Sequence, residues 1–310
     1  MTLNTHNFLN KRSLATLIAT AAAGLFCSAT LAQEEQPTNS PPRSTSRPMV
    51  PTGPIDEQSV NDVETGRRLG AGARRLFEAK ELAMPTQPTG EKAKVALAAP
   101  TGSVMSPEAI YRDRSESVVI VGTVSQKPDL RVNNASGFVI SSDGVIVTNY
   151  HVAGVDKQGA VGFVVMTHDG RVWPVKQVLA KSEKYDVAIL KIEATGLKPV
   201  PIADRIGVGA DVFLISNPSG KFWYFSRGMV SRYAITLRKT DPVDTLQISA
   251  DFARGSSGAP ILSSAGEVVG MVASTNSIYY ETTPEGVQKN LQMVLKSCVT
   301  SKQILELIEH

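Results

Sequence analysis

The chain has 310 residues and a net charge of +3, with an apolar fraction of 42% and a charged fraction of 20%. This length is enough to bury a sizeable core, in one large domain or two small ones. The charge is too small for a typical nucleic-acid-binding protein, which usually carries a strong basic excess, so we expect no nucleic-acid partner.

The first residues are typical of an export signal. Lys11 and Arg12 supply the positive charge, and residues 14–26 form an apolar run rich in Ala and Leu. The run closes with small residues at Thr30 and Ala32, which suit cleavage after Ala32. We therefore expect residues 1–32 to be a signal peptide of a periplasmic or secreted protein that has no other membrane contact. An uncleaved anchor helix is the alternative, because the apolar run could extend toward Ala32.

Cysteine and histidine usage argues against disulfides and metals. Once the signal is removed, Cys298 is the only cysteine, so no internal disulfide can form. We expect Cys298 to pack as a small apolar residue. The histidines and cysteines do not follow metal-ligand spacing, so we expect no metal and no cofactor.

Residues 33–105 form a segment of changing composition. Residues 33–54 are rich in Pro, Ser and Thr, and such a composition buries little apolar surface and predicts disorder. Residues 57–82 have apolar side chains at helical spacing, but three glycines weaken the pattern and predict only a marginal helix or part of a pro-segment. Residues 84–103 return to loop composition. We therefore expect 33–105 to be a linker or pro-segment, and 106–310 to be the folded domain.

Short strand-like runs dominate the rest of the chain, after a short helix that Ser106 caps. The first group of runs comprises residues 118–124, 135–140, 145–148, 161–167, 172–178 and 187–192. The second group comprises residues 211–215, 226–231, 245–249, 259–262, 268–274 and 288–294. Gly and Asp punctuate these runs, and no long helix intervenes, so the pattern predicts an all-β sandwich or a pair of barrels. Residues 300–310 end the chain as a helix, with Ser301 as its cap.

His151 is the best candidate for a catalytic histidine. Of the four histidines, His6 lies in the signal, His310 is the last residue, and His168 lies in a hairpin turn. His151 follows a strand-like run in "VIVTNYHVAG", where a rigid backbone would hold its ring. The alternative is a core histidine with its hydrogen bonds satisfied.

A catalytic histidine needs a carboxylate that orients it and a nucleophile that it activates. Asp186, at the start of the strongly apolar run in "YDVAILKI", is the best carboxylate, although on its own it could simply cap that strand. Ser257 in "DFARGSSGAP" is the best nucleophile. Gly255 frees the backbone so that its N–H and that of Ser257 can point at one spot, as an oxyanion hole requires.

The order of these three residues is more informative than any one of them. Among the known triad orders, His–Asp–Ser is that of the chymotrypsin-type double barrel. His151 and Asp186 fall in the first group of strands and Ser257 in the second. This matches an active site in the crevice between two barrels.

Four segments resemble trypsin-like bacterial proteases of the HtrA/Deg type. "SGFVISSDGVIVTNYHVAG" is similar to their histidine segment, and "YDVAILKIEATG" is similar to their aspartate segment. "GADVFLISNPSG" with "FSRGMVSRY" resembles the start of their second barrel, and "RGSSGAPILSSAGEVVGMVAST" resembles their serine segment. The motifs span roughly residues 118–275 in the family's order, which makes the resemblance specific.

The resemblance implies two six-stranded antiparallel β-barrels, at about 115–200 and 205–297, followed by the C-terminal helix at 300–310. It implies a peptide-bond hydrolase without a cofactor. In this reading His151 is the general acid and base, Asp186 orients it, and Ser257 is the nucleophile. The N–H groups of Gly255 and Ser257 form the oxyanion hole.

The chain departs from its relatives at several points. It ends soon after the second barrel, so we expect no PDZ domain of the kind that many relatives carry. Ser256 replaces the aspartate with which trypsin's own relatives capture a new N-terminus on activation, so we expect that switch to be absent. Ala259 stands where a second glycine is usual, a change we expect to be tolerated.

Substrate selection is predicted at two places. Asp251 precedes Ser257 by six residues, a spacing that in trypsin-like enzymes places an aspartate at the base of the primary specificity pocket and selects Lys or Arg. The alternative is that Asp251 pairs with Arg254 or with loop backbone. We expect Ala273, Ser274 and Thr275 to pair with the substrate backbone as an added β-strand.

The sequence therefore predicts an exported serine endopeptidase that acts on protein or peptide substrates through an acyl-enzyme. One alternative is a catalytically silent protease fold that binds peptides or acts as a chaperone-like envelope protein. Another is an envelope interaction protein that works through residues 33–103. The oligomeric state stays open.

Overall fold

The computed structural model describes residues 54–126, 128–153, 159–238 and 240–309, with the side chains described from residue 61 onward. The predicted signal peptide and the Pro-rich residues 33–53 lie outside this range. No helix in the described part of the chain is both long and apolar enough to span a membrane.

The first half of the fold is a seven-stranded sheet in the order β6-β5-β2-β3-β4-β8-β7. All its pairings are antiparallel. Its strands are β2 (Val118–Gln126), β3 (Leu130–Ser141), β4 (Val145–Thr148), β5 (Ala160–Met166), β6 (Val172–Pro174), β7 (Gln177–Ser182) and β8 (Val187–Lys191). The run predicted at 172–178 is split into two strands. Pro174 ends β6, since proline cannot donate to a further ladder bond, and β7 then pairs with β8 instead of β5.

The second half is a closed antiparallel barrel of six strands in the order β10-β11-β14-β13-β12-β9. Its strands are β9 (Asp211–Ser216), β10 (Tyr224–Arg238), β11 (Asp241–Ile248), β12 (Pro260–Leu262), β13 (Val268–Thr282) and β14 (Gln288–Thr300). Leu214, Leu246 and Ile261 lie fully buried in its core. The predicted all-β architecture with two barrel-like halves is thereby confirmed.

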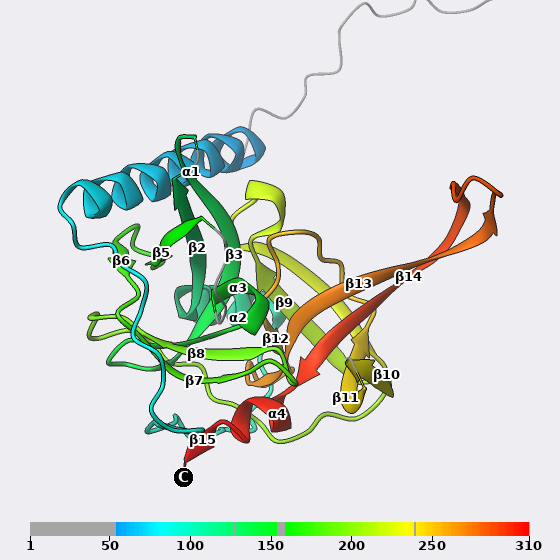
Figure 1. Ribbon diagram of the computed structural model, residues 1–310. Coiled ribbons are helices and arrows are strands. Elements are labelled where there is room, and N and C mark those ends of the chain that lie inside the picture. The colour runs from blue at the N-terminus through cyan, green and yellow to red at the C-terminus, as the bar shows by residue number, and fades with distance from the viewer. Residues whose placement is uncertain (1–53, 127, 154–158, 239, 310) are drawn as a thin grey trace, which may run out of the picture. The chain divides into compact units, whose positions relative to one another are not determined.

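The helix α1 (Pro54–Glu78) covers the outer face of the first sheet (Figure 1). Leu69 and Leu76 are buried against Ile120 and Val164, while the neighbouring Val119 points to the opposite face of β2 and packs in the sheet's inner core. The sequence predicts only a marginal helix here, within a linker. Burial of one apolar face against the sheet supplies the stability that helix propensity lacks.

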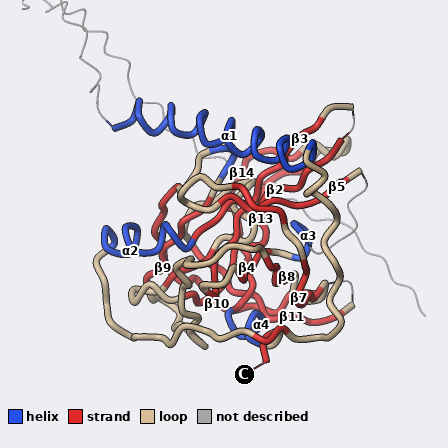
Figure 2. Tube along the Cα trace, turned by 90° about the vertical axis from the view of Figure 1, so that its left-hand side faces the viewer, coloured by secondary structure: helices blue, strands red, loops and turns tan. Residues whose placement is uncertain are grey.

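The remaining elements are short. They are β1 (Ala93–Lys94), α2 (Pro107–Arg114), η1 (Ser115–Ser117), α3 (Tyr150–Ala153), η2 (Pro218–Gly220), α4 (Ser301–Leu305) and β15 (Ile308–Glu309). Ser106 caps α2, as its sequence predicts. In Figures 1 and 2, α1 lies at one end of the molecule, and α4 with the last described residues lies at the other.

The predicted helix at 300–310 is too long, and its cap is one residue earlier. Thr300 caps α4 in a capping box with Gln303. The helix ends at Leu305 because the following backbone pairs elsewhere: the Leu307 carbonyl accepts a 2.8 Å hydrogen bond from the Ala93 N–H. Ile308 then continues as a parallel partner of β1.

Two hairpins of the barrel are longer than the sequence predicts. Strand β10 continues to Arg238 and β11 begins at Asp241, while β13 and β14 run outward beyond the barrel. Figure 1 shows the β13–β14 hairpin projecting away from the body of the molecule. Both hairpins border a cleft of the molecule.

Candidate active site

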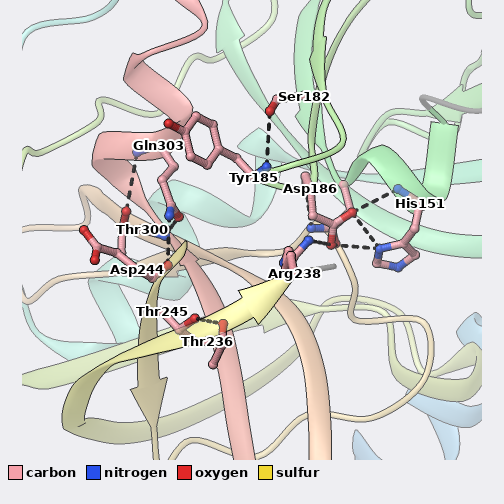
Figure 3. Close-up of polar contacts among 11 residues, drawn as sticks. His151, Ser182, Tyr185, Asp186, Thr236, Arg238, Asp244, Thr245, Thr300 and Gln303 are labelled. Carbon is pink, nitrogen blue, oxygen red and sulfur yellow. Dashed lines mark hydrogen bonds and ion pairs between the residues drawn. The ribbon is translucent and has the colours of Figure 1, made fainter. Parts of the chain in front are cut away.

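Neighbouring strands bring His151 and Asp186 together. His151 lies in α3, directly after β4, and Asp186 directly precedes β8. Since β4 and β8 are antiparallel partners, with Thr148 opposite Ala188, the end of one strand meets the start of the other. The two side chains face each other at this edge (Figure 3).

The Asp186 carboxylate binds His151 at two points. Its Oδ1 accepts a 3.0 Å hydrogen bond from the backbone N–H of His151, and both of its oxygens lie 3.0 Å from His151 Nδ1. A proton on Nδ1 donates to the carboxylate and leaves Nε2 as the acceptor nitrogen. The His151 side chain is 49% exposed, whereas Asp186 is buried. One ring nitrogen is thus fixed by a buried anion, and the imidazole still reaches solvent.

The backbone at Asp186, which presents this carboxylate, has an unusual conformation. Its φ is +60°, in the left-handed region that non-glycine residues seldom adopt. The Asn149 amide, on the segment that leads into α3, donates a 3.0 Å hydrogen bond to the Asp186 carbonyl and holds this conformation. Strain of this kind is concentrated at functional sites.

The loop that carries Ser257 belongs to the second barrel but is fixed to the first sheet. Ser136 of β3 donates its N–H to the Ser257 carbonyl at 2.9 Å and its hydroxyl to the Gly255 carbonyl at 2.9 Å. On the side of its own barrel, Gly258 donates its N–H to the Val272 carbonyl. The loop is therefore held from both halves of the fold.

Both glycines of this loop are required by close packing. Gly255 has φ +99°, and a Cβ there would lie 2.4 Å from the Asn217 carbonyl oxygen. Gly258 has φ +88°, and its Cβ would lie 2.1 Å from the Ser136 carbonyl oxygen. These positions exclude any side chain, so "GSSG" is a specific packing signal here rather than a generic turn.

The two serines of the loop have different surroundings. Ser256 is fully buried, its hydroxyl lies 3.0 Å from that of Ser216, and its N–H donates to the Ala253 carbonyl. Ser257 is partly exposed. Across the described residues, neither the Gly255 N–H nor the Ser257 N–H donates a hydrogen bond, so both donors are available to a bound anion. Among those same residues, no hydrogen bond joins Ser257 to His151. In unliganded enzymes such bonds are often long and tighten on binding.

A cleft of about 1090 Å³ opens beside His151 and Asp186. Its walls combine α3 and the β7–β8 loop of the first half with the β10–β11 and β13–β14 hairpins, and neither Ser257 nor Gly255 is among the lining residues. Of the three residues predicted to pair with substrate, Ala273 and Ser274 line the cleft, and Thr275 does not. Cys298 of β14 also contributes to the lining but is itself buried, and burial raises the pKa of its thiol well above the usual range.

Arg238 was not anticipated from the sequence. It ends β10, and its Nη1 lies 3.5 Å from Oδ2 of Asp186, across the cleft (Figure 3). The guanidinium therefore shares the carboxylate with His151. No local pattern could reveal this contact, because it depends on how far the β10–β11 hairpin reaches toward the first sheet.

Within the described ranges, Asp251 does not have the partner Arg254 that the sequence suggested as an alternative to a role in substrate selection. Its side chain is 85% exposed and forms an ion pair with Lys296 of β14, whose side chain is 13% exposed. Its backbone carbonyl accepts a 2.8 Å hydrogen bond from Ser226. It does not belong to the lining of the cleft. Selection of Lys or Arg by Asp251 stays a prediction, and the Lys296 ammonium already occupies the carboxylate.

The described residues contain no group of three or more His, Cys, Asp or Glu side chains that could hold a metal ion. Near the cleft the chain itself offers a hydroxyl at Ser257, an imidazole at His151 with the buried Asp186 carboxylate, and the N–H groups of Gly255 and Ser257.

Comparison with known proteins gives consistent matches. The family model "Trypsin-like peptidase domain" matches residues 135–271. A "Probable periplasmic serine endoprotease DegP-like" of Halomonas elongata is 36% identical over 138 residues, which cover 44% of this chain and 28% of that protein. "Protease Do-like 1, chloroplastic" of Arabidopsis thaliana is 34% identical over 179 residues, which cover 52% of this chain and 39% of the relative. The chain thus spans about a third of the length of these relatives.

A solved structure agrees at the level of the fold. "HtrA-type protease AlgW with tripeptide" superposes with a TM-score of 0.52 at 22% identity, covering 65% of this chain and 62% of that one.

Proposed function

We propose that this chain, an HtrA-like protein with a trypsin-like peptidase domain, is a serine endopeptidase that cleaves protein or peptide substrates. The observation that carries the proposal is the contact between the His151 imidazole and the buried Asp186 carboxylate. A histidine oriented in this way, on the rim of a large cleft, is the arrangement that activates a hydroxyl nucleophile. The glycine-flanked Ser257, with two free N–H donors beside it, supports the same reaction.

In the proposed mechanism, Ser257 Oγ attacks the scissile carbonyl carbon while His151 Nε2 takes the hydroxyl proton. Asp186 stabilises the resulting imidazolium, and the N–H groups of Gly255 and Ser257 donate to the oxyanion. The tetrahedral intermediate collapses as the imidazolium gives its proton to the leaving amine. Water, deprotonated by the same imidazole, then attacks the acyl-enzyme, which releases the acid and returns the proton to Ser257.

A fluorophosphonate probe tests this proposal directly, because it labels only an activated serine. We expect it to label the full-length protein and to lose that labelling in Ser257→Ala. Ser256→Ala is the matched control, since its hydroxyl is buried in contact with Ser216, and it should keep the labelling. A folded protein that is never labelled would favour a catalytically silent peptide binder. Labelling that survives in Ser257→Ala, or equal loss in both variants, would refute Ser257 as the specific nucleophile.

The proposal includes export. The relatives named as periplasmic support it, together with the charged and apolar pattern of the first 32 residues. N-terminal sequencing of the protein recovered from the periplasm or medium should give Gln33 as the first residue. Recovery of only the uncleaved chain in the membrane fraction would instead support the anchor alternative.

A further inference from the structure

The β13–β14 hairpin continues outward as a two-stranded arm, which we define as residues 276–295. Strand β14 pairs with β11 only over Lys296–Cys298, and β13 pairs with β12 only over Val268–Met271. Beyond these contacts the two arm strands pair only with each other in the part of the chain that the structure describes. A hairpin isolated in this way is marginal in water, and its outer edges are open to another strand.

One face of the arm is free of charge and carries large apolar side chains. By register, Asn276 lies opposite Leu295, and Ile278 lies opposite Met293. Tyr280 follows on the same face, because alternate residues of a strand point the same way. Ile278, Tyr280 and Met293 are 40%, 77% and 57% exposed. Apolar side chains exposed together in this way usually mark a binding surface.

The charged residues of the arm strands lie on its other face. Glu281 is paired with Lys289 in the ladder, and Tyr279 is paired with Leu291. Along β13, Tyr279 and Glu281 alternate with Ile278 and Tyr280, so both pairs lie on the face opposite Ile278 and Met293. This second face also carries Leu291 and Val294, which are 54% and 36% exposed, so the two faces of the arm differ in charge rather than in the presence of apolar side chains.

The uncharged face leads directly into the cleft. Asn276 and Leu295, at the base of the arm, both line the cleft beside His151 and Asp186. A polypeptide that occupies the cleft and continues outward meets Ile278 and Met293 next, and then Tyr280. The arm strand from Asn276 to Thr282 is about 20 Å long, the length of about six or seven extended residues.

We propose that this apolar face of the arm binds an extended apolar segment of a substrate polypeptide that also occupies the cleft beside His151. The inference rests on the proposed peptidase function. The continuity of the face with the cleft favours substrate over a second copy of the chain as the occupant. The arm would thus select substrates at a distance from the bond that is cut.

Paired peptides test this inference. One is a short peptide that contains only a cleaved sequence, and the others add about seven apolar residues on its N-terminal or C-terminal side. Matched peptides carry Ser and Asn in the added segment. We expect an apolar extension on one side to raise kcat/KM roughly tenfold, chiefly through KM, and the polar extension to have no such effect.

Two arm variants separate the faces. Tyr280→Ser/Met293→Ser should remove the gain from the apolar extension while leaving cleavage of the short peptide unchanged. Leu291→Ser/Val294→Ser, on the opposite face, is the matched control and should retain the gain. An equal loss in both variants, or no gain from any extension, would overturn the inference.

Two further measurements keep the inference separate from the proposed activity. Binding of the extended peptides to Ser257→Ala, followed by fluorescence anisotropy, requires no hydrolysis, so it tests the arm even if the peptidase proposal fails. Tyr280→Ser/Met293→Ser should weaken this binding roughly tenfold. Light scattering tests whether a second copy of the chain occupies the face instead. The proposal would be refuted if Tyr280→Ser/Met293→Ser changed the oligomeric state and lowered the rates for short and extended peptides equally. Such a result would assign the face to a second copy.

Discussion

Replacing Gly258 by alanine should both destabilise the protein and displace its proposed nucleophile. The added Cβ would lie 2.1 Å from the Ser136 carbonyl oxygen and 2.4 Å from Thr148 Oγ1. These two groups already hydrogen-bond to each other at 2.8 Å, and Ser136 also holds the Ser257 carbonyl. Neither can move away without breaking a buried hydrogen bond, so the loop itself must shift.

The magnitude follows from two separate costs. A left-handed backbone costs about 1–2 kcal/mol for alanine, and forcing a methyl group into a packed region costs about 1–3 kcal/mol more. The sum is about 2–5 kcal/mol of unfolding free energy, or roughly 5–15 °C in Tm for a domain of this size. Gly209 provides the matched control: its φ is +85°, and a Cβ there would meet nothing within 4 Å. Gly209→Ala should therefore lose only about 1–2 kcal/mol.

Urea unfolding and labelling by the fluorophosphonate probe measure the two effects. Gly258→Ala should be clearly less stable than Gly209→Ala and should label at least tenfold more slowly, since a small displacement of a nucleophile is costly. Gly209→Ala should label like the unmodified protein. If both variants lose the same stability, the crowding around Gly258 has been misjudged and the reasoning fails.

Three further predictions concern individual side chains. Asp186→Asn should lower kcat by about 10⁴-fold with little change in KM, because an amide does not stabilise the imidazolium; a loss below tenfold in steady-state assays would contradict this. Arg238→Gln should raise kcat by up to about fivefold, since the guanidinium no longer shares the Asp186 carboxylate, and should change Tm by only a few degrees; a fall in kcat would show that Arg238 assists the site. Burial raises the pKa of Cys298 above its ordinary 9.0, so the folded state retains a proton that the unfolded state releases. The unfolding free energy should therefore fall as pH rises above about 9, by at most about 1.4 kcal/mol per pH unit, and urea titrations at several pH values should show no such component in Cys298→Ala.

Matched variants control the first two of these predictions. Asp211 and Arg227 form an exposed ion pair away from the cleft. Asp211→Asn and Arg227→Gln should leave kcat unchanged, and equal effects in these variants would point to a general loss of charge rather than to the site.

The sequence predicted the strands that a local pattern can specify. Most runs of apolar residues between turn signals became strands at nearly the predicted places, and β4 matches its predicted bounds. The stability of helix α1 was underestimated, because it comes from packing of its apolar side chains on the sheet and not from intrinsic helix propensity. On the arm, residues 288–294 were predicted as a strand, but the outer part of β13 beyond residue 274 was missed, because its exposed side chains lack the buried alternation on which strand prediction depends.

The site residues show the same difference between features that a local sequence pattern specifies and features that depend on how distant segments pack. His151 and Asp186 were identifiable because each sits where a strand meets its connection, so a short pattern predicts both position and proximity. Arg238 and Lys296 reach their partners, Asp186 and Asp251, across separations of more than forty residues. Those contacts depend on hairpin length and strand register, which no short pattern contains.

The bonds from Ser136 to the serine loop have a consequence for when the proposed peptidase activity can appear. The loop belongs to the second barrel, yet its shape near Gly255 and Ser257 depends on two hydrogen bonds from a strand of the first sheet. A partly synthesised or half-folded chain would lack one side of this support and could not order Ser257, the proposed nucleophile. The serine loop would then be ordered, and the proposed activity would appear, only after both halves of the fold have packed against each other.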